Sequence, residues 1–108
     1  MMEENVNKII EKLSSPLIRD ILLIIKENQP VTVYAIYKII RKSNNTVDKS
    51  YLYKIMSDLE SLRVLSSEKV RRGNKIITFY SLSDNVRISS SNYFYFKGYG
   101  IELKIKRS

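Results

Sequence analysis

Side chains suited to binding rather than to catalysis gather in one stretch of the sequence, between Lys49 and Ser57. Within it, Leu52, Ile55 and Met56 fall at helical spacing, so we predict a helix over 48–65, capped at Asp48, with one apolar stripe. Its other face carries hydroxyl groups, aromatic rings and ammonium groups, which can contact the groups exposed in a groove. The candidate binding residues on this helix are Lys49, Ser50, Tyr51, Tyr53, Lys54 and Ser57.

A second cluster of polar and cationic residues follows this helix. Residues 66–70 and 76–84 have the pattern of strands, and Gly73-Asn74 between them tolerates positive φ, so the sequence predicts a β-hairpin. A cationic hairpin tip suits a phosphate backbone or a minor groove. The alternative is that these charges only protect the strand edges from association. The candidate contact residues are Lys69, Arg71, Arg72, Asn74 and Lys75.

The composition argues against most catalytic chemistry. The chain of 108 residues has no Cys and no His, which removes disulfides, thiolate metal sites, nearly all zinc ligation and the usual general base. We find no paired-carboxylate or Gly-rich phosphate motif either, and we expect no enzyme activity, no cofactor and no metal. A net charge of +8 should instead draw the protein to phosphates or acidic surfaces.

Three further helices must position the first cluster. Apolar periodicity predicts a short helix over 6–13 and a very apolar, central helix over 16–28, which begins at Pro16 after Ser15. After a break, Thr32 caps a helix over 33–42, and a polar turn over 43–46 joins it to the helix at 48–65. This order matches a helix-turn-helix, whose second helix enters the major groove of DNA, although three-helix bundles without that function look alike at this level.

The C-terminal residues 85–108 are rich in Phe and Tyr, and apolar Ile101, Leu103 and Ile105 alternate there with charged residues. This pattern favours a second hairpin around 98–100, with one apolar and one basic face. Such a tail should pack on its own domain or on a partner subunit, or extend the sheet of the first hairpin. We therefore predict a single α+β domain, with a DNA-binding part over 1–84 and a β-like C-terminal extension over 85–108.

Neither a membrane anchor nor a secretory signal is expected from the sequence. The longest apolar run, Ile21 to Ile25, is far shorter than the roughly 20 residues needed to cross a bilayer. The first ten residues are acidic at their start and lack the basic flank and apolar core of a signal peptide. The sequence predicts a cytoplasmic protein.

Three segments together resemble winged helix-turn-helix regulators, most closely the PadR-like family. Residues 31–40 resemble the short strand and first helix of the motif. Leu52-Tyr53-Lys54-Ile55-Met56 with Leu59-Glu60-Ser61-Leu62 resembles the recognition helix "LYxxLxxLE", and Tyr80-Ser81-Leu82-Ser83-Asp84 resembles the wing ending "YxLT". The resemblance covers about residues 16–84 and implies helices followed by a two-stranded wing, in a regulator that usually works as a dimer. The chain also resembles, more loosely, the compact winged-helix proteins of archaea and their viruses.

Two features depart from that family. Arg63 stands where members usually have Gly, so the left-handed end of the recognition helix must be reshaped or replaced. Members also continue into a C-terminal dimerisation helix, whereas residues 85–108 have the pattern of strands.

These observations predict a sequence-specific transcription regulator that binds double-stranded DNA. The helix at 48–65 would lie in the major groove, and the wing would contact the backbone or the minor groove. The alternative is a winged-helix module that binds another protein within a transcription or replication assembly. We expect a homodimer, formed by the two N-terminal helices rather than by the tail, with Ile10 pointing outward.

Overall fold

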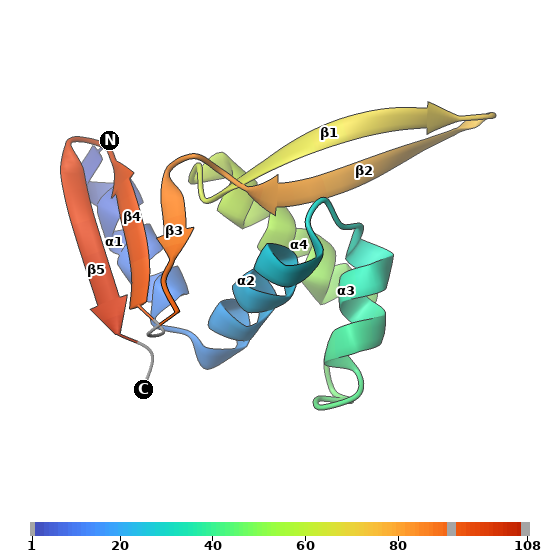
Figure 1. Ribbon diagram of the computed structural model, residues 1–108, viewed down its shortest axis with the longest axis horizontal. Coiled ribbons are helices and arrows are strands. Elements are labelled where there is room, and N and C mark those ends of the chain that lie inside the picture. Colours follow the sequence, from blue (N-terminus) through green and yellow to red (C-terminus); the bar gives the residue numbers. More distant parts are fainter. Residues whose placement is uncertain (1, 91–92, 107–108) are drawn as a thin grey trace.

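Four helices come first and the strands follow in the computed structural model, which describes residues 2–90 and 93–106. The helices are α1 (Met2–Leu13), α2 (Pro16–Asn28), α3 (Val33–Ile40) and α4 (Lys49–Ser61). The strands are β1 (Leu65–Arg72), β2 (Lys75–Leu82), β3 (Val86–Ile88), β4 (Tyr93–Gly98) and β5 (Ile101–Lys106). Figure 1 shows the β1–β2 hairpin projecting from the helices like a wing, so the predicted α+β winged-helix class is confirmed.

Three helices begin at the predicted caps, because short polar side chains there accept the first free N–H groups. Ser15, Thr32 and Asp48 accept from the residue three positions on, at 3.3, 3.2 and 2.7 Å. Helix α1 begins earlier than predicted, at Met2, and carries Glu3 and Glu4 in its first turn, where carboxylates suit the helix dipole.

The end of α4 keeps the left-handed conformation although it has no glycine. Arg63 has φ of +66°. Its N–H donates to Glu60 O at 3.0 Å, and the N–H of Val64 donates to Leu59 O at 2.9 Å, which is the hydrogen-bond pattern of a Schellman motif. A non-glycine residue in this region costs about 1–2 kcal/mol. The guanidinium of Arg63 lies over the ring of Tyr99, 5.3 Å from its centroid, so the side chain also ties α4 to the C-terminal sheet.

The wing strands extend further toward the tip than predicted. They pair from Leu65 with Leu82 to Arg72 with Lys75, and only Gly73 and Asn74 remain as the loop. Gly73 has φ of +62°, which suits the first loop position of a type II′ turn. The second strand was predicted to end at residue 84, but it ends at Leu82.

The base of the wing is fastened to the start of α3. Val31 and Tyr80 exchange two backbone hydrogen bonds of 2.9 and 2.7 Å, which confirms the short extended piece before Thr32. The side-chain oxygen of Gln29 also accepts from the N–H of Leu82 at 2.9 Å. Because these contacts lie next to the helix-turn-helix, they fix the direction in which the wing leaves the body.

The C-terminal strands form a separate antiparallel sheet in the order β3-β4-β5. The predicted hairpin is confirmed as β4–β5, but β3 was missed because three residues are too short for a pattern. The described strands of the tail do not extend the wing sheet; they pack on their own domain, in front of α1 in Figure 1. Lys26 of α2 donates to Ile88 O at 3.1 Å, and Arg19 of α2 donates to Lys106 O at 3.3 Å.

One hydrophobic core joins the helices to this sheet. Alternate residues of β4 point into it, and the aromatic rings of Phe94 and Phe96 are completely or almost completely buried. The side chains without measurable exposure include Ile9, Leu13, Ile21, Leu22, Ile25, Ile36, Leu52, Met56, Leu59 and Val64. The molecule is elongated, 41 × 29 × 24 Å, and the wing and the C-terminal sheet lie toward opposite ends of it.

Candidate nucleic-acid interface

The exposed face of α4 follows from its buried stripe. Leu52, Ile55, Met56 and Leu59 face the core, so the remaining positions face solvent. All six candidate residues of this helix, Lys49, Ser50, Tyr51, Tyr53, Lys54 and Ser57, are exposed. The rings of Tyr51 and Tyr53 keep 49% and 57% exposure, which is high for such large side chains.

These six residues do not share a single surface. Lys49 and Tyr53 are four positions apart and lie on the flank of α4 near α3 and the wing. Tyr51 is two positions from each, so helical geometry places it on the opposite flank. The structure therefore divides the predicted contact face, and it brings Lys49 and Tyr53, but not Tyr51, toward the wing.

A cleft of about 450 Å³ separates the wing from the helices. Aromatic rings from two helices meet the second wing strand there, because Tyr34 lies in the first turn of α3 and Tyr53 lies in the first half of α4. The lining residues are Thr32, Val33, Tyr34, Tyr53, Ile76, Ile77 and Thr78. This cleft brings together the two segments that the sequence marked as separate clusters.

The register of the hairpin sorts the wing residues between its two faces. Lys69 pairs with Thr78 and Arg71 with Ile76, and these pairs share the face of the buried Tyr80. The inner face thus carries two cations and Ile76, whose side chain is 64% exposed.

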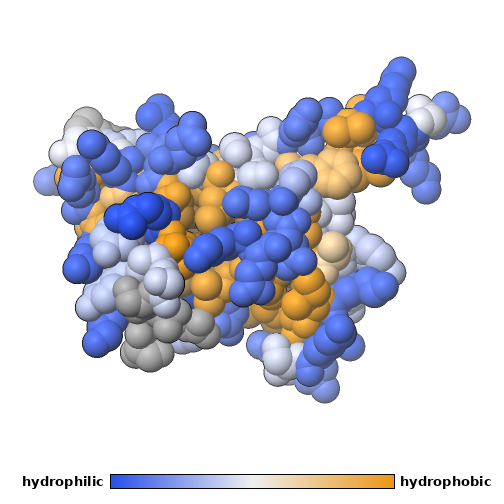
Figure 2. All heavy atoms as spheres, in the orientation of Figure 1, coloured by the Kyte–Doolittle hydropathy of each residue, from blue (hydrophilic) through white to orange (hydrophobic). Residues whose placement is uncertain are grey.

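The tip and the outer face of the wing complete the predicted wing cluster. Arg72 and Lys75 form a pair on the outer face, and Asn74 belongs to the loop between them. All five wing candidates, Lys69, Arg71, Arg72, Asn74 and Lys75, are exposed. Figure 2 shows hydrophilic atoms around the end of the wing, with hydrophobic atoms just behind them.

Helix α3 adds exposed residues that the sequence analysis missed. Lys38 lies over the ring of Tyr34 at 5.5 Å, and Arg41 lies over the ring of Tyr37 at 5.4 Å. Lys49 of α4 lies 5.5 Å from the Tyr34 centroid, so the two helices share this patch. The signal in the sequence is the spacing of Tyr34, Lys38 and Arg41, which places them on one helical face opposite the apolar stripe.

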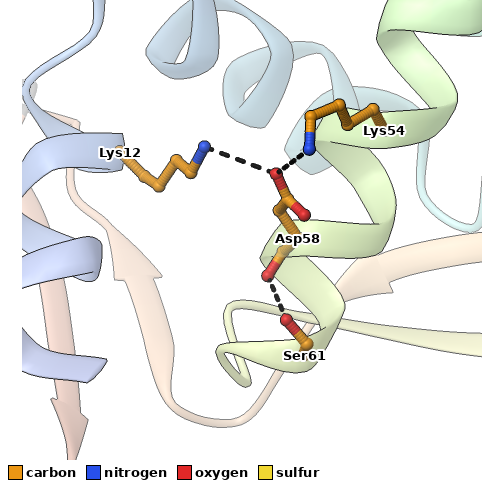
Figure 3. A network of polar contacts seen from close by, with 4 residues as sticks. All are labelled: Lys12, Lys54, Asp58 and Ser61. Atoms are coloured by element: carbon orange, nitrogen blue, oxygen red, sulfur yellow. Dashed lines mark hydrogen bonds and ion pairs between the residues drawn. The ribbon is translucent and has the colours of Figure 1, made fainter. Parts of the chain in front are cut away.

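Lys54 is held by a carboxylate on its own helix. Its ammonium lies 3.6 Å from an oxygen of Asp58, which also lies 3.5 Å from the ammonium of Lys12 in α1 (Figure 3). Ser61 donates to the backbone oxygen of Asp58 at 2.8 Å. The side chain of Lys54 is 72% exposed, so this ion pair is weak and Lys54 can exchange the carboxylate for a phosphate.

Tyr80 is the buried polar residue beneath this surface. Burial raises the pKa of its phenol, and the charge of Glu60 and the nearby Tyr53 raise the pKa further. Its hydroxyl therefore stays neutral at physiological pH, and its ring supports the base of the wing as part of the core.

The described residues offer little for other kinds of site. Among residues 2–90 and 93–106, no group of three or more acidic side chains is placed to hold a metal ion. No helix in the same ranges has the length and apolar character needed to cross a membrane. Comparisons with protein-family models, curated proteins and solved structures find no match for the chain.

Proposed function

We propose that the protein is a cytoplasmic transcription regulator that binds double-stranded DNA in a sequence-specific manner, as the resemblance to PadR-like proteins implies. Helix α4 enters the major groove, and the wing follows the backbone or the adjacent minor groove. The observation that supports this best is the cleft where α3, α4 and the inner face of the wing meet. A convex helix and a projecting hairpin on either side of one cleft fit the grooved surface of a duplex.

Cations flank this cleft on both sides, which suits a ligand with regularly spaced phosphates. Lys38, Arg41 and Lys49 lie on the helical side, and Lys69 and Arg71 lie on the inner face of the wing. Each phosphate that such a group neutralises in a duplex releases counterions, so affinity should fall steeply with salt.

Base recognition depends on residues that project from one face of α4. Ser50, Tyr53 and Ser57 are exposed there, and helix α4 contains no arginine, the commonest reader of guanine. Tyrosine rings and hydroxyls can contact thymine methyls and base edges. Ile76 gives the wing an apolar side chain between its cations, which suits the floor of a minor groove. Specificity should therefore favour A·T-rich sites and depend on DNA shape.

Selection of bound duplexes from a random pool tests this function directly. We expect one enriched motif, with affinity that falls by a slope of about 0.9 per phosphate contacted when plotted as log K against log salt. Equal recovery of all sequences would contradict sequence-specific binding, and no duplex binding at low salt would contradict the function altogether.

A protein-binding winged helix is the second candidate, because three exposed side chains at this surface are large and apolar or aromatic. They are Tyr34, Tyr53 and Ile76. Tyrosine-rich surfaces with few carboxylates are common at protein interfaces. A partner captured through this surface should bind with a shallow salt dependence, which distinguishes it from DNA.

We further propose that the regulator is a homodimer that presents two copies to a pseudo-palindromic site. Ile10 on α1 supports the N-terminal surface, because its side chain is 40% exposed, whereas the apolar face of the C-terminal sheet is used within the chain. Sedimentation should show a dimer at micromolar concentration and a folded monomer for Ile10→Glu. The exposed Lys8→Glu on the same helix is the control. A wild-type monomer would contradict this assembly.

A further inference from the structure

The outer face of the C-terminal sheet is a second surface with the chemistry of nucleic-acid binding. Because side chains alternate along a strand, burying Phe94 and Phe96 directs Tyr93, Tyr95 and Lys97 away from the core. The neighbouring strands contribute Arg87, Glu102, Lys104 and Lys106 to the same face. Four cations therefore stand here against one carboxylate, on the face that the sequence predicts to be basic.

Cations and rings are interleaved across this face. Arg87, Tyr95 and Lys104 are direct cross-strand neighbours, so they form one row over the three strands. The guanidinium of Arg87 lies 4.0 Å from the centroid of Tyr95. The ammonium of Lys104 lies 4.3 Å from the centroid of Tyr93 and 5.9 Å from that of Tyr95. The rings are half-buried and the cations are exposed, and each cation is attracted to the face of the ring that it lies over.

A hollow of about 340 Å³ adjoins this row, within the size range of small-molecule sites. Arg87, Tyr95, Lys97 and Glu102 line it together with Asp84 and Asn85 of the loop before β3. In its lining, an ion pair joins Lys97 to Glu102 at 3.6 Å, and both side chains are at least 75% exposed. Because exposed pairs contribute little, Lys97 can leave Glu102 for a phosphate.

We propose that this face binds single-stranded DNA. Proteins that hold unpaired strands combine aromatic rings, on which bases stack, with cations that follow the backbone, and this face has both within one row. Duplex DNA keeps the faces of its bases inside the stack, so it cannot use the rings. Among the outward residues of β3, β4 and β5 that the structure describes, none is aliphatic, which disfavours insertion into a lipid surface.

The surface is independent of the proposed duplex site. The sheet and the wing lie toward opposite ends of the long axis in Figure 1, and no residue is shared between the two surfaces. A regulator with both would hold a duplex at one end and an unpaired strand at the other. The two binding activities can therefore fail separately.

Fluorescence anisotropy with a labelled dT 20-mer tests the proposal on the full chain. We expect binding at micromolar protein, and loss of at least tenfold in affinity for Tyr93→Ala with Tyr95→Ala, since each stacked base contributes appreciably. Arg87→Ala with Lys104→Ala should make the salt slope shallower by about 1.4, which is 0.7 for each single-strand phosphate. Tyr95→Phe keeps the ring and should bind within about twofold of the wild type, which separates stacking from loss of fold.

Arg71→Ala with Arg72→Ala is the matched control, because it removes two cations from the wing, which lies toward the other end of the molecule in Figure 1. It should weaken duplex binding while the dT affinity stays within about twofold. Equal binding of an rU 20-mer would overturn the assignment to DNA. Unchanged dT affinity in both sheet variants, no dT binding at low salt, or preference for anionic vesicles over dT would overturn the proposal. None of these outcomes bears on the duplex site.

Discussion

The wing and the C-terminal sheet are both antiparallel, aromatic and basic, yet they are stabilised in opposite ways. In the C-terminal sheet one face packs on the core: Phe94 in the central strand has no measurable exposure, and Leu103 and Ile105 of β5 are partly buried. In the wing, burial fades along the strand, from 8% exposure at Tyr80 to 64% at Ile76. A sheet with a buried face belongs to the core, whereas a hairpin held only at its base is free to reach a ligand.

The largest difference between the two regions should appear in stability. Phe94→Ala is expected to lower the free energy of unfolding by about 3–5 kcal/mol, because it leaves a cavity in the common core. Ile76→Ala on the wing should change it by no more than about 0.5 kcal/mol. Urea unfolding followed by circular dichroism measures both. Similar costs for the two variants would show that the C-terminal sheet is not part of the core.

The wing should matter for affinity instead of stability. Arg71→Ala with Arg72→Ala should weaken binding to all duplexes about tenfold or more and reduce the salt slope by about 1.8, since each phosphate contact contributes about 0.9. Titrations at several salt concentrations provide the measurement. The paired control is Arg87→Ala with Lys104→Ala on the C-terminal sheet, which should leave duplex affinity unchanged. A duplex loss that was as large in this control would place the DNA elsewhere.

A smaller effect should separate the two flanks of α4. Tyr53→Ala should change the preferred sequence and cost about 1 kcal/mol at the best site, because Tyr53 lines the cleft beside the wing. Tyr51→Ala, on the opposite flank, should change the order of preferred sites less. Selection from the same random pool with each variant compares them. An altered motif for Tyr51→Ala alone would reverse the assignment of the two flanks.

The smallest expected effect concerns the base of the wing. Burial raises the pKa of Tyr80, so the folded state keeps the phenol proton at pH values where the unfolded chain has lost it. The stability from the neutral phenol is present below about pH 10 and is lost as the pH rises through the higher folded pKa. Tyr80→Phe should therefore lose less stability than the wild type above about pH 10.

Thermal unfolding between neutral pH and pH 11 would measure this difference, with the exposed Tyr34→Phe as the control. Identical pH dependence for Tyr80→Phe and the wild type would show that the phenol does not titrate differently on folding.

Most of the fold could be predicted because its signals are local. Ser15, Thr32 and Asp48 mark helix starts through a single hydrogen bond each, and Gly73-Asn74 marks the hairpin loop. The short strand β3 has no such local signal, because its three residues form a strand by pairing with β4, which comes later in the chain. The sequence could not predict that the wing and the C-terminal strands form two separate sheets. That arrangement depends on how each pair of strands packs on the helices, which is a tertiary property.

The candidate site was predicted only in part for the same reason. Helical periodicity predicts that all six α4 residues are exposed. Which flank of α4 faces the wing, that of Lys49 or that of Tyr51, depends on where α3 and the wing pack. The contribution of Tyr34 and Lys38 required the crossing of α3 and α4. The row of Arg87, Tyr95 and Lys104 required strand register, which no single strand specifies.

The two hydrogen bonds between Val31 and Tyr80 divide the wing into parts with different exchange of amide protons. Between this bridge and the helices, where Leu65 pairs with Leu82, the amides belong to the core and should exchange with solvent only when the whole domain unfolds. Beyond it, the amides near Gly73 are protected by the partner strand alone, so local opening releases them at little cost. A ligand on the tip would slow exchange there and nowhere else, at the expense of the conformational entropy that the free tip possesses.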